Sequence, residues 1–190
     1  MRAAVLLLAL ATAAQGAEIR RVDVEHAGER YYVDSESLVE APIESVYAVL
    51  TDYEHFERIS SVFTASRVLE PVVDGRGLVY TRAEGCLLFF CQTVERVETL
   101  EVDPVTDIVA TADPERSDLR FSRAHWQLES AGEGTRVRYR MELEPDFWVP
   151  PVIGPWAIRR SLTRNGAEAV GRIELLARER AASRLGAREP

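Results

Sequence analysis

The sequence contains no lysine, only two cysteines, and few glycines and prolines, 11 and 9 respectively. All 23 basic residues are arginines spread along the chain, which indicates a coding bias and not a functional device. The low glycine and proline content, with 46% hydrophobic residues, excludes a collagen-like, disordered or disulfide-built protein. The length of 190 residues suits one globular domain with a substantial core.

Positive charge is also scarce relative to negative charge. Acidic residues outnumber basic ones by 31 to 23, which gives a formal net charge of -8 and a pI near 5.0. This balance opposes sequence-independent binding to nucleic acids or to anionic lipids. We therefore expect no nucleic-acid partner.

The sequence motifs of the common enzyme classes are missing as well. There is no Gly-x-Ser-x-Gly elbow, His-Glu-x-x-His pair, phosphate loop or dinucleotide fingerprint. His55 is expected on an exposed helical turn and His125 on the outer face of a strand, so neither is an obvious general base. We expect no catalytic residue, no metal and no cofactor.

The N-terminus has the features of a secretory signal peptide. An apolar stretch over residues 3–14 follows Arg2, and Ala14-Gln15-Gly16 is a small-x-small triplet of the kind that signal peptidase cuts. The stretch is shorter than the ~20 residues that span a bilayer, and no later segment is long and apolar enough to be a transmembrane helix. We expect cleavage after Gly16 and a periplasmic or secreted protein; a helix of the fold or an uncleaved anchor is the less favoured alternative.

Beyond residue 16, hydrophobic periodicity predicts an α+β domain over residues 17–182 and a flexible tail over 183–190. Two strands form a hairpin around Ala27-Gly28-Glu29, two short helices begin near Pro42, and an antiparallel meander covers 64–145. A long helix is expected over 155–182. Its apolar stripe comprises Ile158, Leu162, Ala169, Ile173 and Leu176.

The middle of that stripe is thin, because Asn165, Gly166 and Ala169 are small or polar. Close packing of the helix on the sheet is one explanation, and space left for a ligand is the other.

The segment Ala41–Tyr53, reading APIESVYAVLTDY, and the following Ser66–Leu69 resemble the START-like superfamily. The resemblance is to its polyketide cyclase/dehydrase and Coq10-type branch. It implies a helix-grip fold, in which a curved antiparallel sheet wraps around a long C-terminal helix. It also implies an elongated apolar cavity between the sheet and the helix.

Cys86 and Cys91 bracket four apolar residues between two strand-like runs. A hairpin with this tip places the two cysteines opposite each other, at a separation that suits a disulfide in an oxidising compartment. The alternative is two reduced cysteines in one continuous strand, pointing to opposite faces.

The apolar tip between the cysteines also needs an explanation, because exposed loops are normally polar. One possibility is that residues 147–149 cover the tip. The other is a hydrophobic gate at a cavity mouth, able to touch a membrane. The gate would comprise Leu88, Phe89, Phe90, Phe147 and Trp148.

Inward faces of the predicted strands and helix supply a candidate ligand-binding lining. Its members are Leu78, Tyr80, Arg82, Trp126, Leu128, Tyr139, Met141, Leu162 and Ile173. Arg82 stands out, because an inward charge must be paired or meet a ligand head group. A one-residue bulge that turns Arg82 to solvent is equally compatible with the sequence.

Together these features predict an exported, non-catalytic carrier that reversibly encloses a lipid or isoprenoid. Its partners would be a hydrophobic small molecule or lipid and, transiently, a membrane. Two alternatives stay open. One is a cyclase/dehydrase-type enzyme in which Tyr80, Arg82 or Tyr139 polarises a carbonyl; the other is an envelope protein-interaction module that uses the tip at 87–90.

Overall fold

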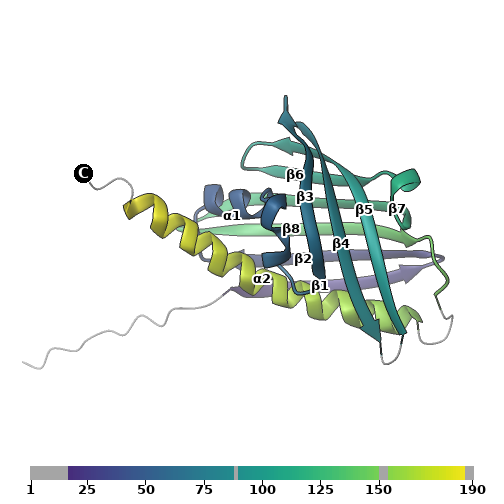
Figure 1. Ribbon diagram of the computed structural model, residues 1–190. Coiled ribbons are helices and arrows are strands. Elements are labelled where there is room, and N and C mark those ends of the chain that lie inside the picture. Colours follow the sequence, from purple (N-terminus) through teal and green to yellow (C-terminus); the bar gives the residue numbers. More distant parts are fainter. Residues whose placement is uncertain (1–16, 88–89, 150–153, 187–190) are drawn as a thin grey trace, which may run out of the picture.

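A computed structural model describes residues 17–87, 90–149 and 154–186, and it shows a strongly curved sheet gripping a long helix (Figure 1). The α+β helix-grip fold expected from the sequence is confirmed. In chain order the elements are β1 (Glu18–Ala27), β2 (Arg30–Val39), α1 (Ile43–Leu50), the 3-10 helix η1 (Tyr53–Arg58), β3 (Phe63–Val73), β4 (Arg76–Leu87), β5 (Phe90–Asp103), β6 (Asp107–Ala112), the 3-10 helix η2 (Pro114–Arg116), β7 (Leu119–Ala131), β8 (Gly134–Pro145) and α2 (Gly154–Gly186).

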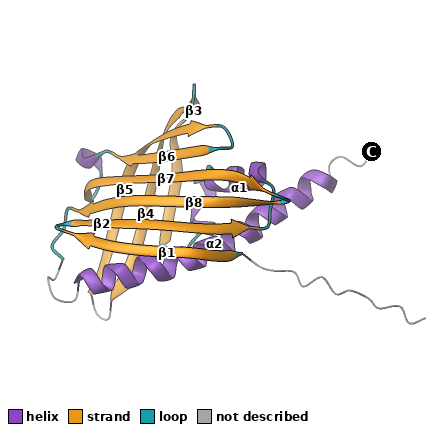
Figure 2. Cartoon of the chain, turned by 180° about the vertical axis from the view of Figure 1, so that it is seen from behind, coloured by secondary structure: helices purple, strands orange, loops and turns teal. Residues whose placement is uncertain are grey.

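The eight strands form one antiparallel sheet in the order β1-β2-β8-β7-β6-β5-β4-β3. From β3 to β8 each strand pairs with the next along the chain, so this part is the predicted meander (Figure 2). The pairing of β2 with β8 joins the N-terminal hairpin to its far end. At the tip of that hairpin Gly28 has a φ of 65°, a left-handed conformation that glycine adopts without strain.

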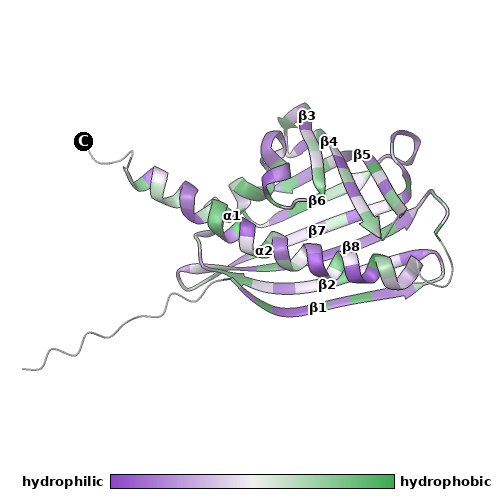
Figure 3. Ribbon diagram, turned by 60° about the horizontal axis from the view of Figure 1, so that its bottom comes forward, coloured by the Kyte–Doolittle hydropathy of each residue, from purple (hydrophilic) through white to green (hydrophobic). Residues whose placement is uncertain are grey.

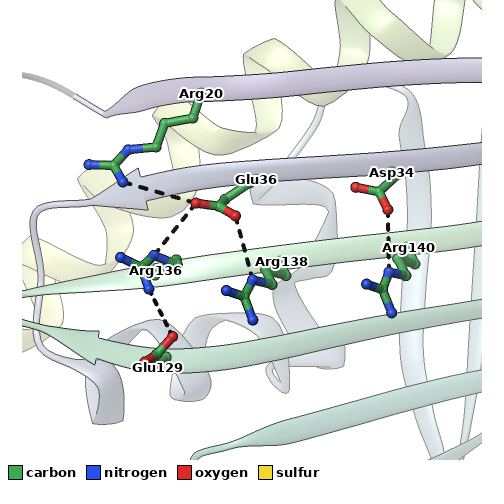
Figure 4. A network of polar contacts seen from close by, with 7 residues as sticks. All are labelled: Arg20, Asp34, Glu36, Glu129, Arg136, Arg138 and Arg140. Carbon is green, nitrogen blue, oxygen red and sulfur yellow. Dashed lines mark hydrogen bonds and ion pairs between the residues drawn. The ribbon is translucent and has the colours of Figure 1, made fainter.

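Alternation along β8 separates the two faces of the sheet, as predicted. Val137 and Met141 are buried on the concave face, whereas Arg138 and Arg140 point to the convex face. On that outer face the β8 arginines pair with acids of neighbouring strands, as Figure 4 shows. Because such exposed ion pairs contribute only ~0–1 kcal/mol each, this row is a solvated surface and not a reason for the fold.

Helix α1 follows the proline at 42, which is its N-cap residue. The carbonyl of Pro42 accepts hydrogen bonds from the backbone N–H groups of Ser45 and Val46 at 2.9 and 3.1 Å. Val46, Val49 and Leu50, spaced for one helical face, are buried in the main core. Pro42 thus starts the helix that closes one end of the grip.

Helix α2 is attached mainly through its C-terminal half. Ile173 and Ala177 are buried there, and the carboxylate of Glu174 accepts a hydrogen bond of 2.9 Å from the backbone N–H of Glu40. Between Ile158 and Arg172, in contrast, no residue is fully buried. The helix continues to Gly186, four residues past its expected end at Ala182, so residues 183–186 belong to α2. No helix in the described ranges has the length and apolar character to cross a bilayer.

Gly134 at the start of β8 lies so close to the backbone of β2 that a larger residue does not fit. A Cβ atom at this position would lie 2.7 Å from the carbonyl oxygen of Val39, too close without a backbone shift. Gly134→Ala should therefore lower the free energy of unfolding by about 1–3 kcal/mol in urea denaturation. Gly85→Ala on β4 is the matched control, because no atom lies within 4 Å of the added Cβ. An equal loss in both variants would contradict the close approach.

Candidate functional site

The cross-strand register places two charged residues on the concave face. Thr81 of β4 pairs with Arg96 of β5, and Val79 pairs with Glu98. Directly paired residues share a face of the sheet, and Val79 is part of the main core. Arg96 and Glu98 therefore point into the grip.

Arg96, Thr81 and Glu98 form a compact polar cluster. Nε of Arg96 donates a hydrogen bond of 3.1 Å to Oγ1 of Thr81, and Thr81 donates one of 3.4 Å to Oε2 of Glu98. Nη1 of Arg96 lies 3.5 Å from Oε1 of Glu98. The side chain of Glu98 is 2% exposed, whereas that of Arg96 is 14% exposed. Oε1 of Glu98 makes no hydrogen bond with any described residue.

A buried carboxylate oxygen without a hydrogen bond is unusual, because desolvating it costs free energy that a donor would offset. The arginine ion pair compensates the charge but leaves this acceptor free. The cluster can therefore accept a hydrogen bond at Glu98 and donate from the accessible edge of Arg96.

Two tyrosine hydroxyl groups lie within the electrostatic range of this pair. Tyr53 on η1 is buried, and Tyr139 on β8 is partly buried. Burial raises the pKa of both phenols above the usual range; Glu98 raises it further, and the positive charge of Arg96 opposes the rise. Both hydroxyls are therefore protonated donors at neutral pH. Tyr139 donates to Sδ of Met141 at 3.0 Å, and because thioether sulfur is a weak acceptor a ligand oxygen can replace it.

Small side chains surround the charged pair on the sheet. Glu98 pairs with Ala112 across β5 and β6, and Ala110 pairs with Ala124 across β6 and β7. On α2, Asn165 and Ala169 are partly buried and Gly166 between them is exposed, so this part of the helix also carries only small or polar side chains.

Larger apolar groups complete this face. Trp126 and Tyr139 are cross-strand partners with ring centroids 5.0 Å apart, and both are only partly buried. Leu162 of α2 packs against the cluster that contains Met141. Apolar surface thus stays accessible between the sheet and the helix, next to a charged pair.

The family of the chain follows from its sequence. The family model described as "Polyketide cyclase / dehydrase and lipid transport" matches residues 39–167. The chain belongs to this family. The match runs from the end of β2 into α2, so it includes the elements that carry Arg96, Glu98 and Tyr139.

Solved structures of the START superfamily share the fold. The Zhui aromatase/cyclase from Streptomyces sp. R1128 superposes with a TM-score of 0.66 at 15% identity, covering 80% of this chain and 96% of that one. A STAR-related lipid transfer protein from Xanthomonas axonopodis gives 0.65 at 18% identity, covering 90% and 98%. A START superfamily protein from Mycobacterium smegmatis gives 0.60 at 16%, covering 76% and 98%. No curated protein sequence matches significantly.

Six of the nine lining residues predicted from the sequence lie on the inner side of this polyketide cyclase/dehydrase-family fold. Trp126, Leu128, Tyr139 and Met141 are on the concave face of the sheet, and Leu162 and Ile173 are on α2. Leu128 and Ile173 belong to the main core, and the other four surround the accessible region. Their role in binding stays a prediction.

The inward orientation predicted for Leu78, Tyr80 and Arg82 is wrong. The inner row of β4 holds the buried Val79 and Thr81, so the alternate residues face outward. The Arg67 guanidinium carbon lies 4.1 Å from the centroid of the Tyr80 ring, and Arg82 pairs with Glu84 at 2.9 Å. No bulge interrupts the pairing of β4 with β5. The row of β4 that was expected to face inward faces outward along the whole strand.

The inward arginine is Arg96, which sequence reasoning missed together with Glu98, Thr81 and Tyr53. A signal was present in the alternation of β5. Its inner row reads Val94, Arg96, Glu98, Leu100 and Val102, an apolar series interrupted by two charges. An interruption of this kind marks charged groups carried to a buried face.

The predicted Cys86–Cys91 disulfide is present and closes the β4–β5 hairpin. The two cysteines are register partners with Cα atoms 4.0 Å apart. Leu88 and Phe89 of the predicted gate lie outside the described residues, as does the Phe90 side chain. Phe147 is partly buried and Trp148 is 71% exposed. The gate stays a prediction.

The outer face has a hollow of about 370 Å³ across β1, β2, β8 and β7, but its lining is nearly all charged or polar. His125 lines it and lies 2.8 Å from Asp107, whose carboxyl has its pKa lowered by this hydrogen bond. Among the described residues, no group of three or more His, Cys, Asp or Glu is arranged to hold a metal ion. The concave cluster is therefore the stronger candidate for a hydrophobic ligand.

Proposed function

We propose that the protein binds a hydrophobic molecule with one polar group between the concave face of the sheet and α2. The observation that carries the proposal is the Glu98–Arg96 pair, which is buried on the concave face and has an acceptor that makes no hydrogen bond with a described residue. Membership in a cyclase/dehydrase and lipid transport family fits a hydrophobic ligand.

The binding mechanism is reversible enclosure. Apolar parts of the ligand contact Trp126, Tyr139 and Leu162, and removing this surface from water stabilises the complex by about 25 cal/mol per Å². The polar group of the ligand binds to Glu98 and to the accessible edge of Arg96. A hydroxyl suits Glu98, and a carbonyl suits the guanidinium.

We place the carrier outside the cytoplasm, in the periplasm or secreted. The support is the disulfide, which persists in oxidising compartments, together with the apolar stretch and cleavage triplet that end at Gly16. An isoprenoid or other lipid is the cargo class that the Coq10-type resemblance suggests.

The alternative is a cyclase/dehydrase-type reaction on a hydrophobic carbonyl compound. It is favoured by the electrostatic coupling of the Tyr139 hydroxyl to Arg96, two groups that together can polarise a carbonyl. In that case Arg96 takes the role that the sequence suggested for Arg82. Turnover that disappears in Tyr139→Phe, with folding and binding intact, would favour the enzyme.

The test is native mass spectrometry of the protein purified without reductant, followed by denaturing mass analysis. We expect a stoichiometric hydrophobic adduct on the wild type. Glu98→Gln should lower the affinity for this adduct, or the fraction of protein that carries it, about tenfold. Hydrogen bonds to charged groups contribute roughly 1.5–3 kcal/mol.

Glu84→Gln is the matched control, because Glu84 faces outward and pairs with Arg82. It should leave the adduct unchanged. Equal binding by the wild type and Glu98→Gln would contradict a role for the concave pair.

A further inference from the structure

The start of α2 and the segment before it are locally basic in an acidic protein. From Phe147 to Ala167 the sequence contains three arginines, at positions 159, 160 and 164, and no aspartate or glutamate. The net charge of the whole chain is -8. This stretch of the chain therefore carries a local excess of positive charge.

These three arginines differ from the arginines later in the same helix. Arg172 and Arg178 pair with Glu168 and Glu174, and Arg180 pairs with Asp52. Within the part of the chain that the structure describes, Arg159, Arg160 and Arg164 form no ion pair. All three are exposed, so their charges are available to a partner.

Two exposed tryptophans accompany the unpaired charges. Trp148 is 71% exposed and Trp156 is 59% exposed. The guanidinium carbon of Arg160 lies 5.8 Å from the centroid of the Trp156 ring. Tryptophan is costly to leave in water, and exposed tryptophans in a segment with arginines that form no ion pair indicate a surface that a partner covers.

The helical spacing places Trp156, Arg160 and Arg164 in one stripe, because residues four apart share a face. The opposite side of this part of α2 carries the partly buried Ile158 and Leu162. Figure 3 shows strongly hydrophilic and hydrophobic segments following each other along this half of the helix. The stripe therefore faces away from the sheet.

We propose that Trp148, Trp156, Arg159, Arg160 and Arg164, the docking face, bind the protein to the surface of an anionic lipid bilayer. Tryptophan rings prefer the head-group region of a bilayer, and arginine binds phosphate through two parallel hydrogen bonds. Each arginine near an anionic surface contributes about 1 kcal/mol.

The negative charge of the rest of the molecule does not prevent this. Exposed charges farther away than ~8–10 Å are largely screened at physiological salt. The acidic remainder is repelled by the same surface, so it orients the protein with the docking face toward the lipid.

The docking face lies at the end of the molecule where the β4–β5 hairpin closes. In Figures 1 and 2 the beginning of α2 is beside the ends of β4 and β5, where the disulfide closes the hairpin. The docking itself does not depend on the proposed ligand site, since no docking residue contacts Arg96 or Glu98 in the described contacts.

Vesicle co-sedimentation of the purified protein tests the proposal, with phosphatidylcholine vesicles compared with vesicles that also contain phosphatidylglycerol. The wild type should bind the anionic vesicles, and added salt should weaken binding. Arg160→Glu/Arg164→Glu should lower the partition coefficient at least about 30-fold. Trp148→Ala/Trp156→Ala should lower it about tenfold.

Arg184→Glu/Leu185→Ala is the matched control, an exposed arginine and an exposed leucine at the other end of α2. It should change partitioning less than about twofold. Circular dichroism checks that all variants fold. Equal binding to both vesicle types, no binding, or an equal loss in the control would overturn the proposal, whatever the result for Glu98→Gln.

Discussion

Arg96→Leu should lower the free energy of unfolding by about 3–5 kcal/mol, as expected when one partner of a buried ion pair is removed. The substitution leaves the carboxylate of Glu98, 2% exposed, without a positive charge next to it. It also removes the hydrogen bond from Nε to Thr81. Urea denaturation of the purified variant measures the loss.

Arg82→Leu is the control for this prediction. Arg82 also pairs with a glutamate, but its side chain is 42% exposed on the outer face. Its removal should cost less than about 1 kcal/mol. The double variant Arg96→Leu/Glu98→Leu should regain much of the stability lost in Arg96→Leu, because no buried charge remains. If Arg96→Leu cost no more than Arg82→Leu, the inward pair would be refuted.

Cys86→Ser/Cys91→Ser should lower the free energy of unfolding by about 2 kcal/mol. A bridge between residues five apart restricts a short loop of the unfolded chain, and loop entropy gives a value of this size. For a protein of this length the melting temperature should fall by about 4–8 °C. Differential scanning calorimetry of the oxidised wild type and the variant gives both numbers.

Reductant provides the internal control for the disulfide. It should destabilise the wild type by the same amount and leave the double serine variant unchanged. A wild type whose melting temperature does not respond to reductant would show that the bridge is absent or energetically neutral, and would weaken the case for an oxidising compartment.

The sequence predicted those parts of the fold in which the alternation of apolar and polar residues is compatible with only one arrangement. Val137, Met141 and the arginines between them alternate clearly, so β8 and its two faces were read correctly. Glycine at 28 marked the first hairpin, and the cysteine spacing marked the β4–β5 hairpin. In these segments local chemistry and tertiary burial agree.

The residue pattern of β4 does not reveal which of its two alternating rows of side chains faces the concave side, because both rows contain apolar residues. The outer row has the larger side chains, yet the inner row, with Val79 and Thr81, is the buried one. Tyr80 stays outside because the Arg67 guanidinium covers its ring, which no short-range pattern reveals. Tertiary packing, and not side-chain size, decided which row turned inward.

The candidate site was predicted in part for the same reason. Its apolar members, such as Trp126 and Tyr139, followed from alternation. The inward charge was predicted at Arg82 and is found at Arg96, because the row of β4 that faces inward is the one with Val79 and Thr81. Tyr53 approaches the pair only through the packing of η1, a long-range contact that the local sequence does not encode.

A crystal structure of the protein with the molecule it retains on purification tests the central claim most directly. We predict density between the concave face and α2, with a polar ligand atom ~2.6–3.2 Å from Oε1 of Glu98 or from the guanidinium of Arg96. Density in the outer hollow beside His125, or a ligand whose polar group does not approach the pair, would contradict the account.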